Sequence, residues 1–197
     1  EIKRTEFELW EKIKSKCIQG RRSGLGITAE GDMLAALNLR YGSEEATKFA
    51  IEIQKTLAIE AYKTSVVLAK ERGSFPIYDS NKEVNNPFIQ RLAKESPLLY
   101  SNMVKYGRRN IALLTIAPTG TTSMMSQTTS GIEPVFKISY KRRRKVNPTD
   151  QKARVDFVDE MGDKWEEHHV FHHKFKIWLV ENGVDLDKIN LMSNDEI

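Results

Sequence analysis

The amino-acid sequence predicts a helix-rich α/β fold, and three observations lead to this prediction. Several long stretches repeat apolar residues at helical spacing. The segment 111–117 is a continuous apolar run with β-branched residues, which is typical of a strand buried on both faces. Residues 135–146 alternate in polarity, which indicates a second strand. Because helices and strands are interleaved along the chain, we expect residues 1–197 to form one unit and not two separable domains.

The first predicted helix covers residues 5–18. Phe7, Trp10 and Ile13 recur at helical spacing, and Gly20 ends the pattern. Cys17 continues the same apolar stripe. We expect Cys17 to be a small buried core residue and not a nucleophile, because neither a nearby His nor a second Cys accompanies it.

The longest predicted helix begins at Ser43, a good N-cap residue, and runs to about Lys70. Its stripe of small and apolar residues predicts close packing against another helix or a sheet. Two shorter helices are expected from 87 to 95 and from 97 to 105, because each stretch begins with a Pro at the first helical position. We expect the long helix from Ser43 to about Lys70 to serve as scaffold.

The last predicted helix covers residues 165–181 and contains all four histidines. On a helix, His168 and His172 would lie one turn apart and could bind Zn or Ni. No Cys lies nearby to complete a site. We therefore expect no native metal site, with His168 and His172 as weak candidates only.

Composition sets further limits. The chain has 31 Lys and Arg against 27 Asp and Glu, with 40% hydrophobic residues, which is typical of a globular protein. No apolar run is long enough for a membrane helix, and the first ten residues do not resemble a signal peptide. A single cysteine excludes an internal disulfide framework and favours a reducing, cytoplasmic setting. Because the chain starts with Glu1, we expect a piece of a longer or processed polypeptide.

Basic residues are unevenly distributed. The run Lys141–Lys145 contains five consecutive cations, which could bind nucleic acid or form a solvated face. No motif of a known nucleic-acid-binding module appears, and the net charge is only +4, so nucleic acid is the weaker alternative. The pairs Arg21–Arg22 and Arg108–Arg109 could complement substrate charge or serve in scaffold pairing.

The most informative segment is the loop 117–123, which directly follows the predicted strand 111–117 and is rich in hydroxyl groups. Backbone N–H groups at a helix N-terminus, together with Thr or Ser hydroxyls, are the donors that a phosphate needs. Gly120 would let an anion approach the backbone, and Pro118 would fix the direction of the chain. The alternative is an ordinary strand-to-helix turn with a Thr N-cap. The loop is not a Walker A motif, because no Lys follows a glycine at the required spacing.

Five motifs in the same order resemble the catalytic subunit of ribonucleotide reductase. The strongest is Thr115–Ser123, followed by Ser130–Pro134. The others are Arg21–Gly26 with Asp32–Leu34, then Tyr41–Ala46, then Arg72–Pro76. The resemblance covers about residues 20–145.

The resemblance implies a ten-stranded α/β barrel built from two half-barrels, with this chain in the second half. It implies that the finger loop with its radical cysteine and the N-terminal effector region are absent from residues 1–197. Cys17 matches none of the family's catalytic cysteines. We therefore expect no catalytic residue in this chain and no turnover by the chain alone.

The resemblance also implies a substrate, a cofactor and partners. The family reduces ribonucleotides to deoxyribonucleotides for DNA synthesis, and the loop matching this one binds the substrate phosphates. The implied phosphate-binding residues are Pro118, Thr119, Gly120, Thr121 and Thr122. Ser123 and Glu133 are candidate supporting residues, and Glu133 could be a buried carboxylate, a cap or an ion-pair partner. The Pro-Thr-Gly-Thr sequence of the loop is similar to that of the adenosylcobalamin-dependent branch of the family. This similarity implies adenosylcobalamin as the cofactor. It also implies a thioredoxin-type reductant and the remainder of the reductase chain as partners.

Overall fold

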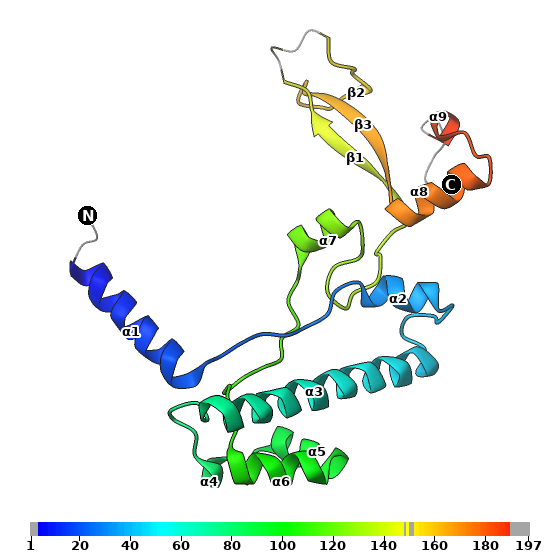
Figure 1. Ribbon diagram of the computed structural model, residues 1–197. Coiled ribbons are helices and arrows are strands. Elements are labelled where there is room, and N and C mark those ends of the chain that lie inside the picture. Colours follow the sequence, from blue (N-terminus) through cyan, green and yellow to red (C-terminus); the bar gives the residue numbers. More distant parts are fainter. Residues whose placement is uncertain (1–3, 148, 150–151, 190–197) are drawn as a thin grey trace.

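The computed structural model describes residues 4–147, 149 and 152–189 (Figure 1). It is helix-rich, with a small antiparallel sheet near the C-terminus, so the predicted helix-rich α/β class is confirmed. Three parts follow one another in space: a lone N-terminal helix, a helical body, and a C-terminal arm that contains the sheet (Figure 1). No helix in the described part of the chain is both long enough and apolar enough to cross a membrane.

The helical body is built on α3 (Glu44–Arg72), against which α5 (Pro87–Glu95) and α6 (Pro97–Tyr106) pack. The short α4 (Ser80–Glu83) connects α3 to this pair. The predicted start of α3 is confirmed, because the Ser43 hydroxyl accepts a hydrogen bond from the Ala46 N–H at 3.2 Å. The two predicted proline starts are also confirmed. The buried core of the body consists of Ala58, Tyr62, Val66, Ile89, Leu92, Leu99, Met103 and Leu113.

Two extended segments run parallel and side by side above α3. The Ser23 N–H donates to the Ala112 carbonyl at 2.9 Å, and the Thr115 N–H donates to the Leu25 carbonyl at 2.9 Å. The bridge between Leu25 and Leu114 is parallel. The prediction that 111–117 is buried on both faces is wrong, because Ile116 is 60% exposed. Within the described chain, this segment has the helical body on one face and a partner segment along one edge, so the rest of its surface stays open.

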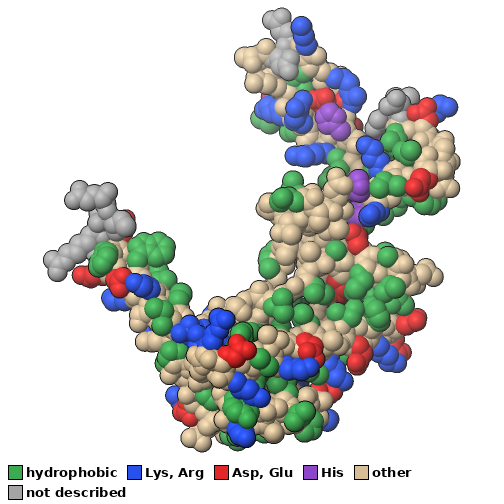
Figure 2. Space-filling model, viewed as in Figure 1, with side chains coloured by type: hydrophobic (Ala, Val, Ile, Leu, Met, Phe, Trp, Pro, Cys, Tyr) green, Lys and Arg blue, Asp and Glu red, His purple; other side chains and the backbone are tan. Residues whose placement is uncertain are grey.

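The helix α1 (Arg4–Gly20) stands apart from the body (Figure 1). Its apolar stripe faces solvent: Trp10 is 60% exposed, and Figure 2 shows hydrophobic side chains on its surface. The predicted helix is confirmed, but the prediction of a buried Cys17 is wrong, because Cys17 is exposed. The apolar stripe of α1 lies on one helix as predicted, yet no described element packs against it.

The C-terminal arm is a three-stranded antiparallel sheet in the order β1-β3-β2, followed by two helices. Its elements are β1 (Ser139–Lys145), β2 (Phe157–Val158), β3 (Lys164–Phe171), α8 (His173–Glu181) and α9 (Leu186–Ile189). The predicted strand at 135–146 is confirmed from Ser139, while Phe136 precedes it and is 93% exposed. The predicted helix at 165–181 is wrong in its first half, because residues 164–171 form β3. Pairing of β3 with β1 overrides the helical spacing there.

The chain exposes much more surface than a compact protein of its mass. Its accessible surface is 14671 Å², whereas a compact monomer of 22.6 kDa exposes about 9,500 Å². The excess arises because α1 and the C-terminal arm extend away from the helical body (Figure 1). The chain therefore buries only part of its apolar surface against itself.

Candidate functional site

The candidate site lies where the two parallel segments end and α7 (Gly120–Ser126) begins. Thr119 precedes α7 in the left-handed region, with φ of 50°. The first hydrogen bond of the helix runs from the Ser123 N–H to the Thr119 carbonyl at 2.8 Å. The N–H groups of residues 120–122 therefore have no acceptor within the helix. They form one end of a helix dipole, which favours an anion.

Two threonine hydroxyls fasten this loop to the neighbouring segments. The Thr119 Oγ1 atom accepts from the Gly131 N–H at 2.8 Å and lies 2.8 Å from the Thr28 Oγ1 atom. The Thr28 Oγ1 atom also accepts from the Gly131 N–H, at 3.2 Å, and donates to the Thr129 carbonyl at 3.3 Å. We call Thr28, Thr119 and Gly131 the threonine clamp. The clamp uses the Thr119 hydroxyl to hold the loop in place.

A second set of contacts supports the clamp from α2 (Glu30–Ala36). The Thr129 N–H donates to Asp32 Oδ2 at 3.1 Å, and the Asp32 N–H donates back to Thr129 Oγ1 at 3.3 Å. Gly31 allows this approach, because a Cβ atom there would lie 2.6 Å from the Glu133 carbonyl oxygen. Three motifs that are distant in the sequence, around residues 24–34, 115–123 and 130–134, thus meet at one place.

The candidate phosphate-binding residues divide into two groups. Thr121 and Thr122 are exposed, and so is Gly120, whose position has open space where a Cβ would lie. Pro118 is exposed beside them. Thr119, by contrast, is engaged in the clamp.

The two candidate supporting residues also differ. Ser123 is buried, and its hydroxyl donates to the Gly120 carbonyl at 2.8 Å, so Ser123 stabilises the first turn of α7. Glu133 is exposed, which excludes the buried carboxylate and leaves the other two alternatives, a cap or an ion-pair partner. An anion at this loop would meet the backbone N–H groups and the two exposed hydroxyls.

Sequence reasoning assigned no site role to Thr28, Asp32 or Thr129, although Asp32 stands in one of the motifs that carry the resemblance. No local signal reveals their contacts, because their partners lie 91 to 103 residues away for Thr28 and 97 residues away for the Asp32–Thr129 pair. Their proximity follows from the parallel pairing of the two extended segments, which only the fold reveals.

The histidines do not form the metal pair that a helix would give. His168 lies in β3, and its Nε2 atom is 3.4 Å from Glu166 Oε1. His172 follows β3, and its Nε2 atom is 3.6 Å from Asp32 Oδ1, which links the C-terminal arm to α2. The described residues contain no group of three or more metal-binding side chains.

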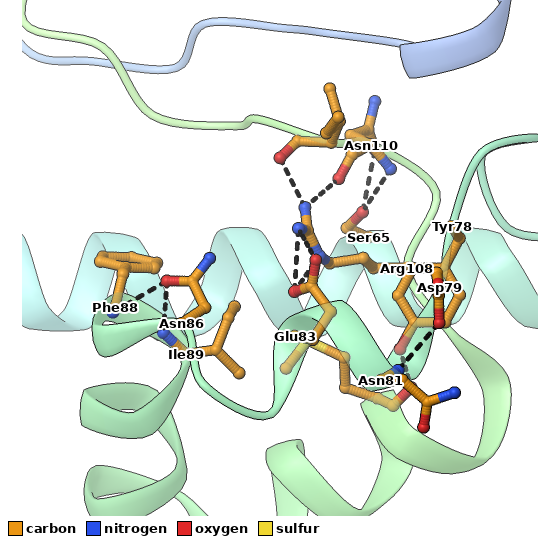
Figure 3. Close-up of polar contacts among 12 residues, drawn as sticks. Ser65, Tyr78, Asp79, Asn81, Glu83, Asn86, Phe88, Ile89, Arg108 and Asn110 are labelled. Carbon is orange, nitrogen blue, oxygen red and sulfur yellow. Dashed lines mark hydrogen bonds and ion pairs between the residues drawn. The ribbon is translucent and has the colours of Figure 1, made fainter.

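Arg108 has a scaffold role. Its side chain is 4% exposed, and its Nη2 atom donates to Glu83 Oε1 at 2.8 Å (Figure 3). Its Nη1 atom donates to the Ile111 carbonyl at 2.7 Å. The guanidinium also lies over the Tyr62 ring, whose pKa is raised by burial. Arg108 therefore ties α4 to the extended segment that leads to the loop.

The basic run 141–145 is largely neutralised across the sheet. Arg143 pairs with Glu167 at 2.7 Å and Arg144 pairs with Glu166 at 2.6 Å. Lys145 pairs with Asp163. These ion pairs engage three of the five cations and give the run a structural role within the arm.

Comparison with known proteins identifies the family of the chain. The family model for the ribonucleotide reductase barrel domain matches residues 3–177. The chain is 36% identical over 122 residues to a vitamin B12-dependent ribonucleoside-diphosphate reductase of Mycobacterium tuberculosis, which covers 62% of this chain and 15% of that protein. It is 35% identical over 133 residues to the enzyme of the same name from Thermoplasma acidophilum, covering 67% and 15%.

A third relative is named without reference to vitamin B12. It is a ribonucleoside-diphosphate reductase subunit alpha of Chlamydia pneumoniae, 32% identical over 145 residues, which cover 64% of this chain and 14% of that protein. The chain thus spans about one seventh of the length of the relatives it matches. Because the family model covers most of its residues, the chain belongs to the ribonucleotide reductase barrel-domain family.

Proposed function

We propose that this chain is part of an enzyme that reduces ribonucleotides to deoxyribonucleotides, and that its loop 118–122 binds the substrate phosphates. The observation that carries the proposal is the exposed N-terminus of α7 beside the threonine clamp. Unpaired N–H groups, two exposed Thr hydroxyls and an unobstructed Gly120 converge there. The loop lies at the carboxyl ends of two parallel segments, where α/β proteins bind their ligands.

In this proposal, residues of this chain bind the substrate phosphates, and residues outside it carry out the radical chemistry. The backbone N–H groups of residues 120–122 hold the phosphate oxygens, and the Thr121 and Thr122 hydroxyls add hydrogen bonds. The clamp keeps the loop in this shape before the substrate arrives, which reduces the entropy cost of binding. The only cysteine, Cys17, is exposed and belongs to α1, a helix that stands apart from α7 (Figure 1). The names of the relatives support a ribonucleoside diphosphate as substrate.

We propose that residues 1–197 belong to the second half of a ten-stranded barrel, in which the parallel segments 20–25 and 111–115 are two strands. Their parallel hydrogen bonding and the open surface beside them support this assignment. The remainder of the reductase chain would complete the barrel. We also propose that the whole enzyme uses a thioredoxin-type reductant and is located in the cytoplasm.

Adenosylcobalamin is the proposed cofactor of the whole enzyme, because two of the relatives are named vitamin B12-dependent. The cavity between α2, α3 and α5, about 680 Å³, suits a drug-sized molecule and not a corrinoid with its axial groups. We therefore assign no residue of this chain to the cofactor.

Isothermal titration with CDP, CTP and inorganic phosphate tests the loop. The parent chain is compared with Thr121→Ala/Thr122→Ala and with Thr64→Ala, which removes an exposed threonine on α3. We expect CDP binding in the parent and in Thr64→Ala, and a loss of affinity of roughly tenfold or more in the double variant. Equal CDP binding by all three proteins would contradict the assignment of the loop.

A further inference from the structure

Three arginines from different parts of the sequence meet at one corner of the helical body. Arg109 Nη1 donates to the Arg72 carbonyl at 2.7 Å and to the Gly73 carbonyl at 2.9 Å, at the end of α3. Arg21 directly follows α1, and its carbonyl accepts from Asn110 Nδ2 at 2.9 Å. The ends of α1 and α3 and the start of the extended segment 109–117 are thus held together. Figure 2 shows blue side chains gathered where α1 joins the body. We call Arg21, Arg72 and Arg109 the arginine corner.

The arginine corner has no carboxylate partner among the described residues. The adjacent Arg108 is paired with Glu83, and none of the ion pairs in the described chain includes Arg21, Arg72 or Arg109. Partial burial and the charges of Arg21 and Arg72 lower the pKa of Arg109 from its usual value. The charge of Arg109 therefore lies within electrostatic reach of two like charges.

Helix ends account for part of this charge but not for all of it. The C-termini of α1 and α3 each carry about half a negative charge. Together they offset about one of the three positive charges, which leaves an excess of about two. Only Nη1 of the Arg109 guanidinium donates to the α3 carbonyls. The buried Nε atom of Arg21 has no acceptor in the described chain.

We propose that the arginine corner binds a multivalent phosphate anion, of which pyrophosphate is the simplest example. Guanidinium groups present paired N–H donors that match phosphate oxygens. The site is separate from the loop 118–122, because α7 lies well away from the ends of α1 and α3 (Figure 1). The eight residue steps from Arg109 to Ala117 can span up to roughly 26 Å. The corner therefore does not complement the charge of a substrate held at that loop.

Titration of the isotopically labelled chain with pyrophosphate, followed by amide NMR, tests the proposal. We expect saturable shifts at residues 21, 72, 73 and 109 in the parent chain. Arg109→Gln and Arg72→Gln should each weaken the binding roughly tenfold. Arg72 is exposed, so its substitution leaves the fold intact. The matched control is Arg40→Gln, which removes an exposed arginine away from the corner and should leave the affinity unchanged.

The outcomes separate this site from the loop. Saturable shifts at the corner that persist in Thr121→Ala/Thr122→Ala support the arginine corner, whatever happens at the loop. Shifts confined to residues 119–123 would overturn the corner and leave the loop proposal standing. Equal weakening by Arg40→Gln would show that only the overall charge matters, and would also overturn it. Saturation by poly-glutamate without any response to pyrophosphate would reject a phosphate ligand in favour of an acidic polypeptide.

Discussion

The Oγ1 atoms of Thr28 and Thr119 lie 2.8 Å apart, although 91 residues separate them in the sequence. Both hydroxyls accept from the same N–H group, that of Gly131, at 3.2 and 2.8 Å. Each threonine lies just beyond one of the two parallel segments, so the pair joins the segments at the point where α7 begins. The shape of the candidate phosphate loop therefore depends on residues outside it.

Thr119→Val should destabilise the chain and weaken CDP binding. Valine has the same shape and branching as threonine but cannot accept the hydrogen bond from Gly131, which is buried. Loss of this acceptor should cost about 0.5–1.5 kcal/mol of the free energy of unfolding, measured by urea denaturation, because the Gly131 N–H keeps its longer hydrogen bond to Thr28 Oγ1. Thr121→Val is the matched control, and its stability should change by less than about 0.5 kcal/mol because Thr121 is exposed. Equal stability of the two variants would contradict the clamp.

Gly120→Ala should weaken nucleotide binding without destabilising the fold. A Cβ at Gly120 would meet no atom within 4 Å, and alanine favours a helix by up to about 1 kcal/mol over glycine. The added methyl group would, however, occupy the space through which a phosphate approaches the N–H groups. Urea denaturation and titration with CDP should therefore change in opposite directions. Unchanged CDP affinity would indicate that the phosphate does not contact the backbone at Gly120.

Gly31→Ala, unlike Gly120→Ala, should lower the free energy of unfolding. Its Cβ would lie 2.6 Å from the Glu133 carbonyl oxygen and 2.7 Å from Pro134 Cα, both of which are backbone atoms. Overpacking of this kind costs about 1–3 kcal/mol. A Gly31→Ala chain as stable as Gly120→Ala in urea would contradict the close approach of α2 to residues 133–134.

The sequence was sufficient where the signals are local. Ser43 caps its helix as expected, and the Pro residues at 87 and 97 start theirs, because caps and prolines act through neighbouring backbone groups. The candidate loop could be recognised for the same reason, since its hydroxyls and Gly120 are contiguous.

Where the sequence predictions were wrong or incomplete, the structure depends on contacts between distant segments. Helical spacing predicted a helix at 165–171, but pairing of Glu166 and Glu167 with the arginines of β1 accompanies a strand there. Cys17 was expected in a core because its stripe is apolar, yet no described element covers α1. Thr28 was missed because its partners are remote in sequence. Patterning within one segment cannot reveal which other segment lies against it.

Glu83→Gln should be strongly destabilising. The substitution leaves the Arg108 guanidinium buried without a charged partner, and breaking such a pair from one side costs about 3–5 kcal/mol. The matched control is Arg143→Gln, whose ion pair with Glu167 is exposed on the arginine side and should contribute no more than about 1 kcal/mol. Urea denaturation measures both changes. Similar losses for the two variants would mean that burial of Arg108 is incomplete in solution.

Acidification should loosen the turn between β2 and β3 through Asp159. The Trp165 indole N–H donates to Asp159 Oδ2 at 2.8 Å, and the Asp163 N–H donates to Oδ1 at 2.9 Å. These bonds favour the carboxylate and lower the Asp159 pKa below 3.8, with the Trp165 bond as the largest cause. A carboxyl group whose pKa is lower in the folded state stabilises that state above its unfolded pKa. The stabilisation is lost as the pH falls through the lower, folded value.

The NMR signal of the Trp165 indole N–H can follow this loss from about pH 6 to about pH 2. In the parent chain the signal should shift and exchange faster with solvent below pH 3.8, the ordinary value for Asp. Asp159→Asn keeps an oxygen acceptor but cannot titrate, so its signal should lose most of the pH dependence. Glu160→Gln, which removes an exposed carboxylate from the same turn, should keep it. An identical acid response in Asp159→Asn and in the parent would assign the transition to another carboxylate, because only the variant lacks the titrating group.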